Sequence, residues 1–89
     1  MNRIEIAPES ASKQIDAFRA AMLSCKHRDT IVYHVGAHCQ DAPLRCWAMG
    51  AYEAGLVILV KERKNGGIFE HCAIRTAKKY RTFIPTHEK

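Results

Sequence analysis

The segment Lys64–Gly67, KNGG, separates two runs that carry apolar and β-branched residues, Leu56–Arg63 and Ile68–Arg75. Asparagine and glycine tolerate the positive φ angles that both central positions of a type I′ turn require. We therefore predict a β-hairpin with a two-residue loop at Asn65 and Gly66. This hairpin constrains the fold more than any other feature of the chain, because two strands must lie side by side.

The two-residue loop also predicts the register of the hairpin. Near the tip, Lys61 would face Glu70 in a favourable cross-strand pair. Toward the base, Leu59 would face Cys72 and Val57 would face Ile74. The hairpin is thus expected to be apolar at its base and charged at its tip.

Two helices are predicted upstream of the hairpin. Start signals at Pro8, Glu9, Ser10 and Ser12 precede one helical stripe, formed by Ala11, Ile15, Phe18 and Met22. This first helix ends near Ser24, and Lys26, His27 and Arg28 follow it. Cations at that position favour the negative end of the helix dipole, so structure alone explains this cluster.

A short strand and a second helix follow. Thr30–Val35, TIVYHV, has strand composition and is bounded by Asp29 and Gly36. Gly36–Gln40 could form a single helical turn, and Asp41 would cap a second helix that stops at Gly55. The apolar stripe of that helix is formed by Leu44, Trp47, Ala48 and Ala51, which leaves Arg45, Met49 and Glu53 on another face.

The positive charge of the chain lies in its last third. Net charge is +5, and residues 1–60 carry six Lys/Arg against six acids, whereas residues 61–89 carry eight against three. This asymmetry favours an anionic partner for that end, nucleic acid before membrane, because no basic amphipathic helix accompanies it. A merely solubilising surface is the alternative.

Size and composition limit the other classes of function. A chain of 89 residues buries only somewhat more than ~60% of its unfolded surface, so we expect one domain and no enzyme cleft. The longest apolar stretch, Gly55–Val60, is far short of the ~20 residues that span a bilayer, and the N-terminus lacks a secretory signal. We expect a cytoplasmic protein with no membrane partner.

The cysteines and histidines predict no metal site. In a reducing compartment Cys25, Cys39, Cys46 and Cys72 are expected to be small buried apolar groups rather than disulfides. No two closely spaced pairs of Cys or His repeat as they do in zinc fingers. No nucleophile signature or phosphate loop is present, so we expect no catalytic residues, no metal and no cofactor.

The order helix, strand, short turn, helix and hairpin resembles the winged helix-turn-helix fold, an α+β class. The resemblance covers roughly residues 11–76, and its specific part is Ala51–Arg75, where EAGLV resembles the exit of a recognition helix. IVYHVG followed by EAGLV is also similar to small winged-helix-like proteins of phage and prophage genomes. We expect a winged-helix-like domain at 1–76 and a basic aromatic tail at 77–89.

The resemblance implies a DNA-binding transcriptional regulator that can form a dimer. Its second helix would present Arg45, Met49 and Glu53 to the major groove of duplex DNA. Its wing would present Lys61, Arg63, Lys64 and Asn65 to phosphates. The tail would add three cations if it follows a phosphate backbone: Lys78, Lys79 and Arg81.

An alternative function is a protein-interaction module or an inhibitor of a host protein. The second helix carries more apolar residues than recognition helices usually do, including Met49 and Tyr52. Aromatic residues and methionine suit the centres of protein interfaces. The tail could then pack as an arm on a second subunit, and the anchors under this hypothesis are Met49, Tyr52, Tyr80 and Phe83. Trp47, at stripe spacing, is expected in the core.

Overall fold

The computed structural model describes residues 2–7, 10–36, 42–81 and 83. Within these residues the elements follow in the order β1 (Arg3–Glu5), α1 (Ala11–Ser24), β2 (Thr30–Gly36), α2 (Ala42–Glu53), β3 (Val57–Arg63) and β4 (Phe69–Arg75). Both predicted helices, the predicted strand and the hairpin are therefore present. Strand β1 was not predicted. The sequence predicted a helical turn over residues 36–40. Gly36 instead ends β2, and the other residues of that segment lie outside the described residues.

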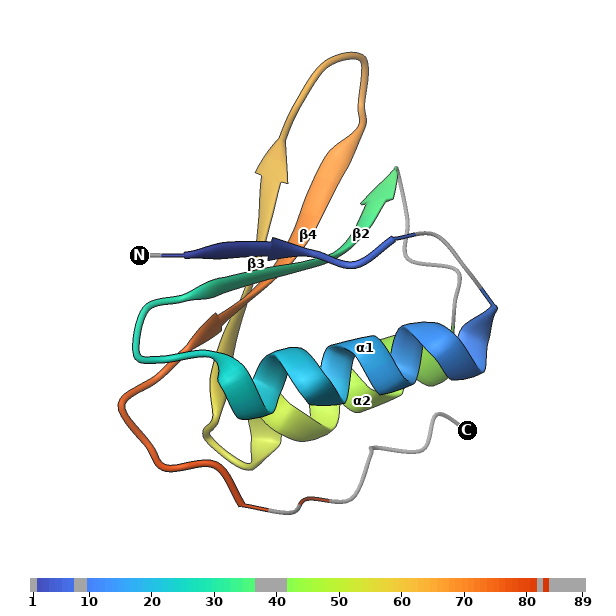
Figure 1. Ribbon diagram of the computed structural model, residues 1–89. Helices are drawn as coiled ribbons and strands as arrows, with labels where there is room; N and C mark the ends of the chain where they lie inside the picture. The colour runs from blue at the N-terminus through green and yellow to red at the C-terminus, as the bar shows by residue number, and fades with distance from the viewer. Residues whose placement is uncertain (1, 8–9, 37–41, 82, 84–89) are drawn as a thin grey trace.

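The four strands form one sheet in the order β1-β2-β4-β3. Strand β1 pairs parallel to β2, whereas β4 lies antiparallel between β2 and β3. The hairpin of β3 and β4 extends well beyond the helices, as Figure 1 shows. The predicted α+β class is confirmed.

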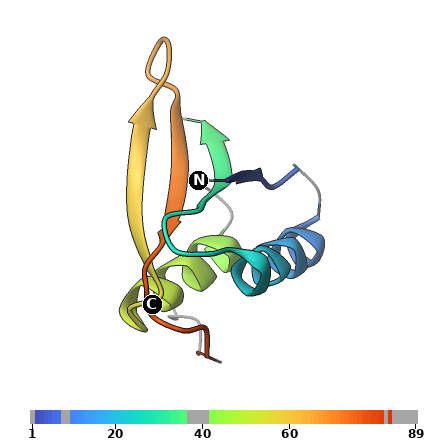
Figure 2. The same cartoon turned by 60° about the vertical axis from the view of Figure 1, so that its left-hand side comes forward.

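Both helices cover the same face of the sheet, and the core lies between them and the strands (Figure 2). The predicted stripe of α1 buries Phe18 and Met22 completely. The stripe of α2 buries Leu44, Ala48 and Ala51, and the half-buried Trp47 packs against the same core, as predicted. From the sheet, the buried members of this core are Ile31, Tyr33, Val57 and Ala73.

Helix α2 stops at the predicted glycine. Gly55 has φ +80°, which L side chains rarely adopt. The N–H of Gly55 donates to the carbonyl of Tyr52, and the N–H of Leu56 donates to the carbonyl of Ala51. This pair of bonds is the Schellman arrangement, which satisfies carbonyls that the helix end would otherwise leave without a partner. It turns the chain directly into β3.

The predicted hairpin register is wrong by one residue. The N–H of Lys64 donates to the carbonyl of Ile68, so the loop is Asn65–Gly67, with Gly66 at φ +60° and Gly67 at φ +80°. Two consecutive glycines both take positive φ, which makes a three-residue loop accessible. A shift of one residue moves each strand residue opposite a new partner. In the structure Lys61 lies opposite His71, Leu59 opposite Ala73, and Val57 opposite Arg75.

Candidate nucleic-acid interface

The outer half of the hairpin exposes two cations that make no ion pair within the described part of the chain. Side chains alternate along a strand, so Lys61 and Arg63 share the helix-bearing side of the sheet with Leu59, which packs against the core. Both cations are exposed, and neither makes an ion pair with any described residue. They are therefore available to an external anion.

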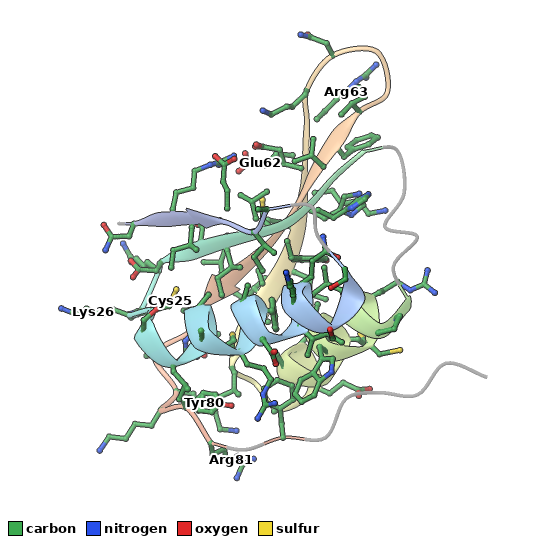
Figure 3. The ribbon with its side chains drawn as sticks, turned by 45° about the vertical axis from the view of Figure 1, so that its right-hand side comes forward. Cys25, Lys26, Glu62, Arg63, Tyr80 and Arg81 are labelled. Carbon is green, nitrogen blue, oxygen red and sulfur yellow. The ribbon has the colours of Figure 1, made fainter. Side chains whose placement is uncertain are left out.

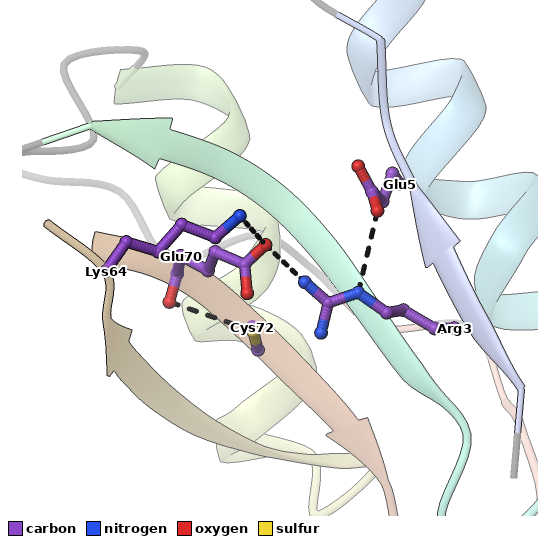
Figure 4. Close-up of polar contacts among 5 residues, drawn as sticks. All are labelled: Arg3, Glu5, Lys64, Glu70 and Cys72. Atoms are coloured by element: carbon purple, nitrogen blue, oxygen red, sulfur yellow. Dashed lines mark hydrogen bonds and ion pairs between the residues drawn. The ribbon is translucent and has the colours of Figure 1, made fainter. Parts of the chain in front are cut away.

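Lys64 is less available, because it is held by a carboxylate of the same hairpin. Its Nζ lies 3.1 Å from Oε2 of Glu70, which also accepts a hydrogen bond from Arg3 (Figure 4). Arg3 and then Lys64 hold the pKa of the Glu70 carboxyl below its usual range. The observed register explains the arrangement, since it places Glu62 directly opposite Glu70, where two like charges repel.

The loop itself projects into solvent. Asn65 is exposed, and its backbone carbonyl accepts the N–H of Ile68. A Cβ at Gly66 or Gly67 would meet nothing within 4 Å. The loop is therefore open to solvent at both glycines.

The outer flank of α2 carries the residues that the sequence assigned to a groove or to a protein partner. Four of them are exposed: Arg45, Met49, Tyr52 and Glu53. Met49 is 39% exposed and Tyr52 is 51% exposed. They are three residues apart on one helix and so share a face. This flank thus carries both charged and apolar groups.

The tail packs on the domain's own helices. Tyr80 and Phe83 are half-buried against the core. The Phe83 and Trp47 ring centroids lie 5.4 Å apart, and the guanidinium of Arg19 lies over the Trp47 ring, 5.2 Å from its centroid. These aromatic contacts are intramolecular, so Tyr80 and Phe83 stabilise the domain itself.

The tail cations differ in their surroundings. The Nζ of Lys78 donates to the carbonyl of Ala54, 2.7 Å away at the C-terminal end of α2. Lys79 and Arg81 are exposed and make no ion pair with a described residue. Of the three tail cations assigned to phosphates from the sequence, Lys78 is thus the one engaged inside the fold.

Sequence reasoning left one basic segment out of the site. Lys26, His27 and Arg28 all expose their side chains in the turn between α1 and β2. In the sequence these three residues form a basic run directly after the first helix. The favourable interaction of cations with the C-terminal end of a helix was sufficient to explain that run. Their backbone geometry is what sets them apart, and it appears only in the tertiary structure.

The cysteines described by the structure are free thiols. Cys25 and Cys72 are buried, as expected, and Cys46 is partly exposed. Burial raises the pKa of both the Cys25 and the Cys72 thiols, which reduces the reactive thiolate at neutral pH. Cys39 lies outside the described residues.

Two kinds of feature are absent from the described ranges 2–7, 10–36, 42–81 and 83. No three His, Cys, Asp or Glu side chains gather there in a way that could hold a metal ion. No helix in these ranges has the length and apolar character needed to cross a bilayer.

Comparisons with protein-family models, with curated proteins and with solved structures give no match to this chain.

Proposed function

We propose that this domain is a small winged-helix-type regulator that binds duplex DNA through the β3–β4 hairpin and the outer flank of α2. The observation that carries the proposal is the pair Lys61 and Arg63. Both are exposed, without an ion pair among described residues, and on the helix-bearing side of a hairpin that extends beyond the body. The order of α1, β2, α2 and the hairpin supports the winged-helix assignment.

The mechanism is electrostatic. Cations placed near phosphates release condensed counterions, which gives affinity that falls with salt and does not depend on base sequence. Phosphate contacts of this kind position a protein on the duplex, whereas contacts to base edges specify sequence. On the flank of α2, Arg45 is the side chain suited to a bidentate contact with guanine.

A salt titration tests the proposal. Binding of a mixed-sequence duplex is measured by fluorescence anisotropy over a range of salt concentrations, for the native chain and for Lys61→Ala with Arg63→Ala. Loss of two phosphate contacts should lower the magnitude of the log–log salt slope by about 1.8. Lys13→Ala is the matched control, because Lys13 is an exposed cation of α1 that makes no ion pair with a described residue. An unchanged slope in the double variant, or no duplex binding at low salt, would refute the proposal.

A second candidate function is protein binding, and the exposure of Met49 and Tyr52 favours it. Two large side chains with apolar surface lie in the solvent on one face of α2. Such residues are enriched at interface centres. Met49→Asp and Tyr52→Asp should each abolish association with a partner while thermal stability stays within a few degrees of the native value. Leu44→Asp, which places a charge in the core, should instead prevent folding. If the two surface variants also fail to fold, this candidate loses its support.

A further inference from the structure

The turn that joins α1 to β2, Lys26–Asp29, is held rigidly by its backbone. We refer to it as the basal turn. The N–H of Lys26 donates to the Asp29 carboxylate, and the N–H of Asp29 donates to the carbonyl of Lys26, both at 2.9 Å. The N–H of Arg28 donates to the carbonyl of Arg75, and the N–H of Arg75 donates to the carbonyl of Asp29. The turn is therefore attached to the end of β4.

Arg28 occupies a backbone conformation that disfavours it. Its φ is +75°, and no other non-glycine residue in the described ranges has a positive φ. The left-handed region is unfavourable for residues with a Cβ, and asparagine or glycine are the types that adopt it most readily. Strained backbone of this kind persists where the surrounding structure holds it, and it is concentrated at functional positions. An arginine thus stands where a glycine would relieve strain.

The carboxylate in the basal turn makes no side-chain ion pair with the turn's cations, although Lys26 interacts with it electrostatically at longer range. Asp29 is 5% exposed, and its two oxygens accept the backbone N–H groups of Asn2 and Lys26. These amide bonds, that of Lys26 first, hold the pKa of the Asp29 carboxyl below its usual value. Neither Lys26 nor Arg28 makes a side-chain ion pair with a described residue. Both side chains are exposed and directed by a rigid backbone.

The basal turn and the hairpin tip lie at opposite ends of the sheet. Strand β4 begins opposite Arg63 and ends at Arg75, whose backbone is hydrogen-bonded to the basal turn. The six residue steps along this strand correspond to ~20 Å. Figure 3 shows Arg63 at the hairpin end and both Lys26 and Arg81 away from it. This separation exceeds the ~12 Å width of the major groove, so the two clusters would contact different phosphates.

We infer that Lys26 and Arg28 form a second phosphate-contacting surface for duplex DNA, at the end of the sheet opposite the hairpin. This inference rests on the proposed function and adds a second anchor to it. A rigid turn loses little conformational entropy when its cations meet phosphates, which favours binding. Lys79 and Arg81, which follow Arg75 along the chain, are also exposed.

The test measures two double variants in the same salt titration. The basal-turn variant combines Lys26→Ala with Arg28→Gly, and the hairpin variant combines Lys61→Ala with Arg63→Ala. The basal-turn variant should lower the magnitude of the salt slope by about 1.8, as the hairpin variant does. Arg28→Gly alone should lose affinity while its thermal midpoint rises or stays level, because glycine relieves the strain at φ +75°. Arg28→Lys keeps the charge and should retain most of the binding.

The outcomes separate this inference from the proposed function. If the basal-turn variant keeps the native slope while the hairpin variant loses its contacts, the second surface is refuted and the proposed function stands. If no duplex binding is found, both fail. Vesicles that contain anionic lipid are the second arm, since lipid headgroups also carry phosphate. Binding to these vesicles and not to DNA would overturn the assignment of duplex DNA as the partner.

Discussion

The ammonium of Lys78 lies 2.7 Å from the carbonyl oxygen of Ala54, at the C-terminal end of α2. A cation at this position interacts favourably with the helix dipole. The backbone N–H of Lys78 also donates to Thr76 Oγ1, whose hydroxyl donates to the carbonyl of Gly55. The start of the tail is therefore bound to the end of α2 by side chain and backbone together.

Replacement of Lys78 should lower stability more than replacement of its neighbour. Lys78→Ala removes the cation from the helix end and is expected to cost about 0.5–1 kcal/mol in the free energy of unfolding. Lys79→Ala is the matched control and should stay within about 0.5 kcal/mol of the native value. Urea denaturation measures both. Equal effects of the two substitutions would contradict the role assigned to Lys78.

Acid should destabilise the domain through Glu70 and Asp29. The pKa of each carboxyl is held below its ordinary value in the folded chain, Glu70 by Arg3 first and Asp29 by the Lys26 amide first. In the unfolded chain these groups bind protons near their ordinary values of about 4.3 and 3.9. The unfolded state therefore binds more protons as the pH falls through this range, and the stability that both groups contribute above it is lost.

Urea midpoints between neutral pH and about pH 3 check this prediction. Glu70→Gln should be less stable than the native chain at neutral pH but should lose less on acidification, because one of the two titrating groups is gone. A native midpoint that stays constant down to about pH 3 would be inconsistent with the carboxylate contacts described here.

A substitution in the hairpin loop distinguishes the observed register from the one predicted by the sequence. Gly67 has φ +80°, and a Cβ there would meet nothing within 4 Å, so the cost of Gly67→Ala comes from the backbone alone. We expect a loss of about 1–2 kcal/mol. In a two-residue loop at Asn65 and Gly66, Gly67 would lie in a strand, where alanine is tolerated. A neutral Gly67→Ala would therefore favour the two-residue loop. Gly67→Asn should cost less than Gly67→Ala, because asparagine tolerates positive φ.

The tail should contribute to stability through Phe83. Its ring contacts Trp47, so Phe83→Ala should cost about 1–2 kcal/mol and expose the indole to water. Trp47 is the one tryptophan of the chain, and its fluorescence emission should shift to longer wavelength. Arg81→Ala, at an exposed neighbouring position, should change neither measurement. An unshifted emission spectrum in Phe83→Ala would contradict the intramolecular packing of the tail.

Features with a local signal were predicted correctly. The stripes of α1 and α2 repeat at helical spacing, and Gly55 adopts the positive φ that its position after α2 suggested. The hairpin was predicted because Asn65 and Gly66 tolerate a tight turn. Its register was wrong because Gly66 and Gly67 allow loops of two or three residues, and sequence propensity does not distinguish the two.

Strand β1 had no comparable signal. It is three residues long, Arg3–Glu5, and exists because it pairs with β2 across a parallel register. Parallel pairing is a non-local contact, separated along the chain by α1. The same strand supplies Arg3 to Glu70, so the element that sequence reasoning missed also stabilises the hairpin.

The sequence by itself determined the two helices, the presence of a hairpin near Asn65 and Gly66, and the positive charge of the last third, because spacing, glycine positions and charge counts are local properties. Only the tertiary structure decided which cations are available to a partner. Lys64 binds Glu70 and Lys78 binds the end of α2, while Lys61, Arg63, Lys26 and Arg28 stay in solvent without an ion pair to a described residue. The physical reason is that an ion pair or a helix-end contact depends on a partner that the fold brings from elsewhere in the chain.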